Sequence, residues 1–184
     1  MSPTSAIPPF YWLIFGWYEP LLTVGGFLGA MLYPKETHDQ QAPWPGGEPP
    51  LDPLPRATVV TIYQLAHVVG LMGLINFFVL GSARRYLFGQ PAVQEKIVGA
   101  LLTPLLFGDI FHMAVTLWAL GETRWDVRNW SGMLWITMVT GITLLGSRVA
   151  WHLGIGRYVH KRDGTQDNKW LILCHYGSSD HVWW

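Results

Sequence analysis

The sequence is poor in charge, has one cysteine and contains no basic cluster. Only 13% of its 184 residues are charged, whereas 50% are hydrophobic and 14% aromatic, and the mean hydropathy is +0.23. This composition is too apolar for a typical soluble domain. The formal net charge is zero and the basic residues are spread along the chain, which argues against nucleic acid as a partner. Cys174 alone cannot form an internal disulfide or a redox pair.

The N-terminus also lacks the features of a cleavable signal peptide. No basic segment precedes the first apolar run, and that run is longer than the core of a signal peptide. We therefore expect the first run to remain in the chain as an uncleaved membrane anchor.

Apolar runs of membrane-spanning length are what the sequence has in abundance. They predict an all-α fold, a four-helix transmembrane bundle, with the lipid bilayer as its surroundings. The predicted spans are 10–33, 57–80, 98–120 and 130–153. Residues 1–164 then form one transmembrane domain, and 165–184 form a flexible cytoplasmic tail. A proline-rich connection between the first two spans predicts an irregular loop.

The distribution of lysine and arginine predicts the orientation of the bundle. Cytoplasmic loops carry an excess of these residues, so the richer side is assigned to the cytoplasm. The richer side holds Arg84, Arg85, Lys96, Arg157, Lys161, Arg162 and Lys169, against Lys35, Arg56, Arg124 and Arg128 on the other. Both termini are therefore predicted to be cytoplasmic. We expect a multi-pass protein of the endoplasmic reticulum.

The third span carries an ionisable pair, Asp109 and His112, within an otherwise apolar run. The two residues are three positions apart, so they project from one face of a helix about one turn from each other. An ionisable residue in hydrocarbon is costly and normally faces the bundle interior, where it has a partner or a function. This pair is the leading candidate for a catalytic site.

Polar residues of the other spans lie at a similar depth. Counted from the cytoplasmic ends at about 1.5 Å per residue, Glu19 lies roughly 14 Å deep, Asp109 roughly 18 Å and His112 roughly 22 Å. His67 and Thr140 both lie at roughly 20 Å. Five side chains from four helices thus reach one level, which predicts an interior polar chamber.

The chamber supplies candidates for catalysis and for ligand contact. The candidate catalytic residues are Asp109, His112, His67 and Glu19. The candidate substrate-binding residues are Gln64, Tyr63, Thr140, Arg148 and Trp118. Arg148 lies lower, roughly 8 Å from the inner edge, and its long side chain can reach toward Glu19.

Each candidate also has a purely structural interpretation. Asp109 and His112 can form a hydrogen bond that only locks helices together, and His67 can be a satisfied core residue. An ion pair is the simpler account of Glu19 and Arg148. Threonines of the fourth span commonly bond back to their own helix.

The acids and histidines do not predict a metal centre. Di-iron bundles need repeated carboxylate–histidine pairs, and the spans contain one such pair. We interpret the tail residues Cys174, His175 and His181 as incidental rather than as a zinc site. No metal and no cofactor are therefore expected.

Short motifs along the chain resemble those of a known group. They are Tyr18-Glu19-Pro20, Gln64-Leu65-Ala66, Gly108-Asp109-Ile110-Phe111-His112, the tryptophans Trp125 and Trp130, and Arg148. From about Phe10 to Tyr158 the chain resembles a family of small four-pass fungal membrane proteins of unknown function. More distantly, its architecture is similar to emopamil-binding and sigma-2 bundles and to membrane terpene cyclases of fungal meroterpenoid pathways. The tail after Gly164 does not match the family.

Two functional hypotheses remain open. In the first, the chamber binds a lipophilic small molecule such as a sterol, terpenoid or polyketide of secondary metabolism. Asp109 with His112 then moves a proton in an isomerisation or cyclisation. In the second, the protein is a non-enzymatic lipid-binding or accessory subunit whose polar residues only lock the helices. Transport is a third option; with only four helices it would require a dimer, and no internal repeat is visible between the two halves of the chain. A homodimer is one assembly compatible with the sequence.

Overall fold

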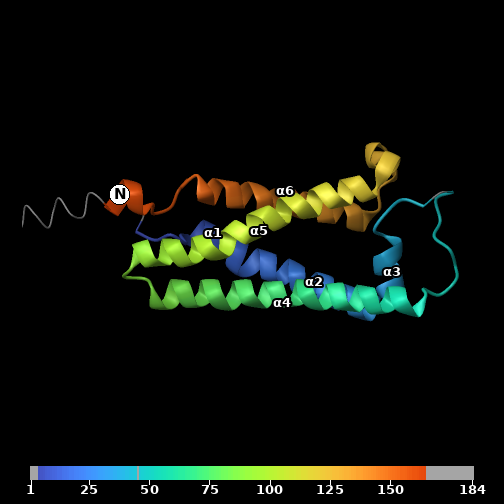
Figure 1. Cartoon of the computed structure of the whole chain (residues 1–184), viewed down its shortest axis with the longest axis horizontal. Helices are drawn as coiled ribbons and strands as arrows, with labels where there is room; N and C mark the ends of the chain where they lie inside the picture. Colours follow the sequence, from blue (N-terminus) through green and yellow to red (C-terminus); the bar gives the residue numbers. More distant parts are fainter. Residues whose placement is uncertain (1–3, 45, 165–184) are drawn as a thin grey trace, which may run out of the picture.

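The computed structural model describes residues 4–44 and 46–164, and four long helical segments dominate it (Figure 1). The first segment is continuous but has three parts, α1 (Pro9–Leu13), η1 (Ile14–Tyr18) and α2 (Glu19–Leu32). The others are α4 (Arg56–Tyr86), α5 (Pro91–Ala119) and α6 (Gly132–His152). All four are long and apolar enough to cross a bilayer. The predicted four-helix transmembrane fold is confirmed, and the chain is a multi-pass integral membrane protein.

Helices α4 and α5 are longer than the spans predicted from hydropathy. Helix α4 continues to Tyr86 rather than stopping at 80, and α5 begins at Pro91 rather than at 98. Arg84 and Arg85 lie in the last turn of α4, where cations interact favourably with the carboxyl end of a helix. Proline in the first turn of α5 removes an N–H that would have no partner within the helix. The hydropathy pattern predicts only the apolar part of each helix, whereas α4 and α5 continue into the polar residues beyond it.

Three short helices lie at the opposite end of the bundle from the N-terminus, which we call the loop end. They are α3 (Pro34–Asp39), η2 (Gly121–Trp125) and η3 (Val127–Asn129). The connection after the first span was predicted to be irregular, but it starts with the six residues of α3. The other end, which carries the N-terminal segment and residues 153–164, is called the terminal end (Figure 1). The tail predicted for 165–184 lies outside the described residues.

The long helices form two pairs, because α2 packs along α4 and α5 packs along α6. Gly73 is buried in α4 and lies against α2. A Cβ atom at Gly73 would lie 1.9 Å from Thr23 Oγ1 and 3.5 Å from the Cα of Pro20. Glycine is therefore required at this crossing of the two helices.

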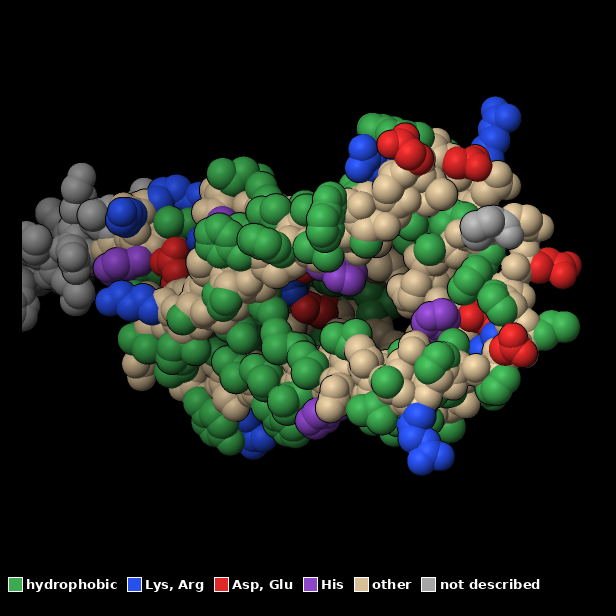
Figure 2. Space-filling model, turned by 45° about the vertical axis from the view of Figure 1, so that its right-hand side comes forward, with side chains coloured by type: hydrophobic (Ala, Val, Ile, Leu, Met, Phe, Trp, Pro, Cys, Tyr) green, Lys and Arg blue, Asp and Glu red, His purple; other side chains and the backbone are tan. Residues whose placement is uncertain are grey.

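The apolar core joins the two pairs in the terminal half of the bundle only. All four long segments contribute to one cluster there, made of Ile7, Tyr11, Phe15, Leu80, Ala83, Val98, Leu102 and Trp151. Toward the loop end, a second cluster lies between α5 and α6 and contains Leu120, Leu134 and Met138. Figure 2 shows a hollow between the two helix pairs, with acidic, basic and histidine side chains at its edge. The apolar core thus joins the pairs at the terminal end, whereas at the loop end Ser131 donates a hydrogen bond to the carbonyl of Gln40.

Replacing Gly73 with alanine is expected to push α2 away from α4. Overpacking of this kind costs about 1–3 kcal/mol. Thermal unfolding in detergent should therefore show a lower melting temperature for Gly73→Ala than for the unmodified chain. The added change Thr23→Ala should restore part of the loss, because it removes the hydroxyl that a Cβ at Gly73 would meet.

Gly29→Ala is the matched control for this experiment. Within the described residues, a Cβ at Gly29 meets no other atom within 4 Å. A glycine-to-alanine change in an open helix position is expected to be neutral or stabilising. Equal melting temperatures for Gly73→Ala and Gly29→Ala would contradict the close crossing.

The predicted orientation can be tested with the single cysteine of the chain, Cys174, which follows the last span. In sealed, right-side-out microsomes, a cytoplasmic C-terminus requires that a membrane-impermeant maleimide labels Cys174 without permeabilisation. A Cys174→Ser chain carrying Gly47→Cys at the loop end should label only after the membrane is permeabilised. The opposite labelling pattern would reverse the orientation.

Candidate functional site

The buried guanidinium of Arg148 joins three helices near the centre of the bundle. Arg148, on α6, is 1% exposed, and its Nη2 donates to Glu19 Oε1 on α2. Its Nη1 donates to Asp109 Oδ2 on α5. The guanidinium also lies over the ring of Phe15, 5.5 Å from its centroid. We call Glu19, Asp109 and Arg148 the ion cluster.

A widened turn places Glu19 in this cluster. Pro20 has no N–H with which to continue the regular hydrogen-bond pattern, and its ring clashes with the carbonyl four residues before it. Residues Ile14–Tyr18 form a π-helical turn instead, and the N–H of Glu19 donates to the carbonyl of Ile14. Such turns accommodate one extra residue in a helix and are frequent at functional sites. The motif Glu19-Pro20 thus both supplies the acid and aims it at Arg148.

The two carboxylates differ in their access to the surroundings. The side chain of Glu19 is 8% exposed, whereas that of Asp109 is 17% exposed. His112, one turn further along α5, is exposed and lies close enough to Asp109 to act on its charge. Arg148 therefore holds Asp109 from the interior of the bundle, and His112, the other member of the predicted pair, lies on the more exposed side.

The structure does not bring every predicted site residue to the ion cluster. His67, Gln64 and Tyr63 are exposed on α4 and lie outside the buried stripe of this helix. The stripe consists of Ala66, Gly73, Asn76, Leu80 and Ala83. Depth along the helix was the basis for including His67 and Gln64, but α4 turns these side chains away from the face packed on α2.

Thr140 and Trp118 also differ from the prediction that they line a ligand chamber. The hydroxyl of Thr140 lies 2.8 Å from the carbonyl of Ile136 and 3.2 Å from that of Thr137, so it bonds within its own helix. Trp118 is 77% exposed, at the loop end of α5. It lies nine residues beyond Asp109, about 13 Å along the helix.

Two buried polar residues at the terminal end were not among the sequence candidates. Gln94 accepts from the N–H of Ala6 at 2.8 Å and donates to the carbonyl of Ala83 at 3.1 Å. Arg157 donates to Glu95 at 2.7 Å, and its guanidinium lies 3.9 Å from the ring centroid of Trp151. Both residues fall outside the predicted spans, so hydropathy gave no signal for their burial. They fasten the N-terminal segment and residues after α6 to the bundle.

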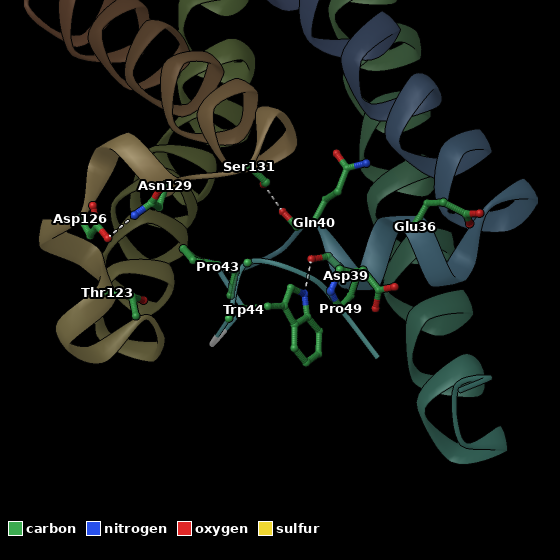
Figure 3. A pocket seen from close by; sticks show the side chains of 13 residues that line it. Glu36, Asp39, Gln40, Pro43, Trp44, Pro49, Thr123, Asp126, Asn129 and Ser131 are labelled. Carbon is green, nitrogen blue, oxygen red and sulfur yellow. Dashed lines mark hydrogen bonds between the residues drawn. The ribbon is translucent and has the colours of Figure 1, made fainter. Parts of the chain in front are cut away.

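A cleft of about 770 Å³ opens at the loop end (Figure 3). It lies between α3 and the segment 123–131, and its acidic residues are Glu36, Asp39 and Asp126. Hydrogen bonds from Lys35 and His38 hold the pKa of Asp39 below its ordinary value. Asn129 donates to Asp126 at 2.7 Å. Because local partners engage two of its acids, the cleft is a weaker candidate than the ion cluster.

Comparison with known proteins adds a family to this geometry. A family model described as a domain of unknown function (DUF7704) matches residues 4–158. The chain belongs to this family. The family match includes all four spans, the ion cluster and His112. Neither the curated proteins nor the solved structures contain a match to the chain.

In this member of the family, Arg148→Met is expected to destabilise the bundle strongly. Removing one partner of a buried ion pair costs about 3–5 kcal/mol, because it leaves the remaining charge uncompensated. Here both Glu19 and Asp109 lose their cation. The measurement is thermal unfolding in detergent, together with the yield of monodisperse protein.

Neutralising the acids in the same background is the control. Glu19→Gln with Asp109→Asn should restore much of the stability that Arg148→Met removes, since no buried carboxylate is then unpaired. Arg148→Lys should be intermediate, because one ammonium cannot match the planar fork that contacts two carboxylates. An Arg148→Met protein as stable as the unmodified chain would show that the cluster does not hold the helices.

Proposed function

We propose that the chain is a membrane-embedded acid/base catalyst, an isomerase or cyclase, acting on a lipophilic metabolite. A sterol, a terpenoid or a polyketide fits the apolar surroundings. The observation that carries the proposal is the position of Asp109. Its carboxylate is held by a buried guanidinium on one side, is partly exposed, and has His112 one turn away.

Charge counting supports a proton-donating role. If all members of the ion cluster are ionised, two carboxylates share one cation and one negative charge is left over. An uncompensated charge at this depth in a bilayer costs several kcal/mol. A proton on one carboxyl group removes that cost. Since Asp109 is the more exposed acid, its proton is the one that a ligand can reach.

A balanced isomerisation can be written with these residues. The carboxyl group of Asp109 gives its proton to one carbon of a ligand double bond, which forms a C–H bond and leaves a carbocation. Neutral His112 then takes a proton from a neighbouring carbon, and a new double bond forms. Transfer of that proton back to Asp109 restores both groups. Arg148 stabilises the carboxylate that exists between these steps.

The hollow between the helix pairs supports entry of a ligand from the bilayer. An apolar molecule already dissolved in lipid can approach Asp109 sideways without crossing water. The resemblance to sterol-isomerase and terpene-cyclase bundles points the same way and favours the endoplasmic reticulum and fungal secondary metabolism.

A non-enzymatic role is the second candidate, and the burial of Arg148 favours it. A guanidinium that is 1% exposed and contacts two other helices is well suited to holding the bundle together. In that case the protein binds lipid or serves as an accessory subunit, and its ion cluster performs no chemistry.

The two candidates make different predictions for Asp109→Asn, introduced at the natural locus. Loss of a general acid lowers a rate by roughly 10²–10⁴-fold. If Asp109 is that acid, metabolite profiles of the Asp109→Asn strain should lose the same product as a gene deletion. Protein abundance in the membrane should remain close to that of the unmodified chain.

Asp126→Asn is the matched control, because Asp126 is an exposed carboxylate at the loop end. A strain that carries Asp126→Asn should still make the product that the deletion strain lacks. A product retained in Asp109→Asn would reject the catalytic proposal. Lower abundance or melting temperature of Asp109→Asn, with no product missing even from the deletion strain, would favour the accessory role.

A further inference from the structure

Asn76 is a buried amide beside the ion cluster. It is 0% exposed and belongs to the stripe of α4 that faces α2. Its amide lies close enough to interact with the carboxylate of Glu19. Among the described residues, however, neither Nδ2 nor Oδ1 of Asn76 has a partner in hydrogen-bonding geometry. A fully buried side chain with two unused polar atoms calls for an explanation.

Two further atoms of the ion cluster share this condition. Glu19 Oε2 and Arg148 Nε are buried and have no hydrogen-bond partner within the described part of the chain. The cluster and Asn76 together therefore present two donors, Asn76 Nδ2 and Arg148 Nε, and two acceptors, Asn76 Oδ1 and Glu19 Oε2. Leaving such a group unsatisfied destabilises the folded protein, so buried groups of this kind normally bind water or a ligand.

We propose that Asn76 and Glu19 form a binding site for a hydroxyl group. The hydroxyl accepts a hydrogen bond from Asn76 Nδ2 and donates one to Glu19 Oε2. It belongs either to a water molecule or to the alcohol of a lipophilic molecule bound between the helix pairs. Binding at this site needs no proton transfer at Asp109, so a protein without catalytic activity would show it as well.

A neutral hydroxyl fits this site better than a charged group does. The two carboxylates of the ion cluster repel a phosphate or a carboxylate. A metal ion or an ammonium group cannot accept from Asn76 Nδ2 or Arg148 Nε. An ether or ester oxygen accepts but cannot donate to Glu19. A hydroxyl does both. A water molecule can donate two hydrogen bonds and accept two, which equals the number of acceptors and donors named above.

The first test is an experimental structure of the unmodified chain, at a resolution that shows ordered water, with and without farnesol as the lipophilic alcohol. An isolated density peak between Asn76 and Glu19 in both structures identifies water. Density that continues into the farnesol chain identifies the alcohol. Direct contact of the amide with the carboxylate, with no density between them, would overturn the proposal. This test does not depend on any variant being folded.

The second test compares thermal stabilisation of the purified protein by farnesol and by its methyl ether. If the alcohol fills the site, farnesol should stabilise the unmodified chain more than the ether does. Asn76→Leu should weaken the apparent affinity for farnesol, derived from this stabilisation, roughly tenfold, which is the equivalent of about one hydrogen bond. Gln90→Leu, a change at an exposed amide just before α5, should leave it unchanged.

The two tests also separate the source of the hydroxyl. Equal stabilisation by farnesol and its ether, combined with an isolated peak at Asn76, assigns the site to water. Equal stabilisation with no peak refutes the site altogether. Neither result bears on the proton chemistry of Asp109, which the Asp109→Asn strain decides separately.

Discussion

One guanidinium contacts two carboxylates from different helices in the interior of this bundle, and the arrangement of the helices depends on that contact. Helix α2 supplies Glu19, α5 supplies Asp109 and α6 supplies Arg148. Lipid tails are as apolar as leucine, so the hydrophobic effect does little to hold membrane helices together. Buried polar contacts and close packing have to do so. Here the ion cluster joins the two helix pairs, while the crossing at Gly73 holds α2 on α4.

The two acids of the ion cluster are not equivalent, because they differ in burial. Glu19 is enclosed by the π-helical turn, Phe15 and Arg148. Asp109 shares the same cation but keeps part of its carboxylate open, with His112 beside it. A contact made only to hold helices gains nothing from an open carboxylate. The unequal burial is the feature that a chemical role explains more fully than a structural role does.

Much of this structure could be predicted from the sequence. The parts that could not be predicted share one cause. Counting residues along each span predicts how deep a side chain lies, and Glu19 was predicted to reach Arg148 on that basis. The count does not predict the direction in which a side chain points. His67 was counted to the same level as Asp109, but it is exposed and lies outside the buried stripe of α4. Hydropathy identifies segments that are apolar enough to lie in hydrocarbon. It therefore gave no signal for the burial of Gln94 and Arg157, which lie beyond the predicted spans.

The order in which the chain is made gives the Glu19–Arg148 contact a consequence for biosynthesis. The two residues are 129 positions apart, with the acid in the first membrane span and its cation in the last. During synthesis the ribosome delivers the acid to the bilayer long before the arginine exists. Until the final span arrives, the first one has to carry its carboxyl group in neutral form or stay shielded by the insertion machinery. The ion cluster of this small bundle can therefore form only after the last span has been inserted.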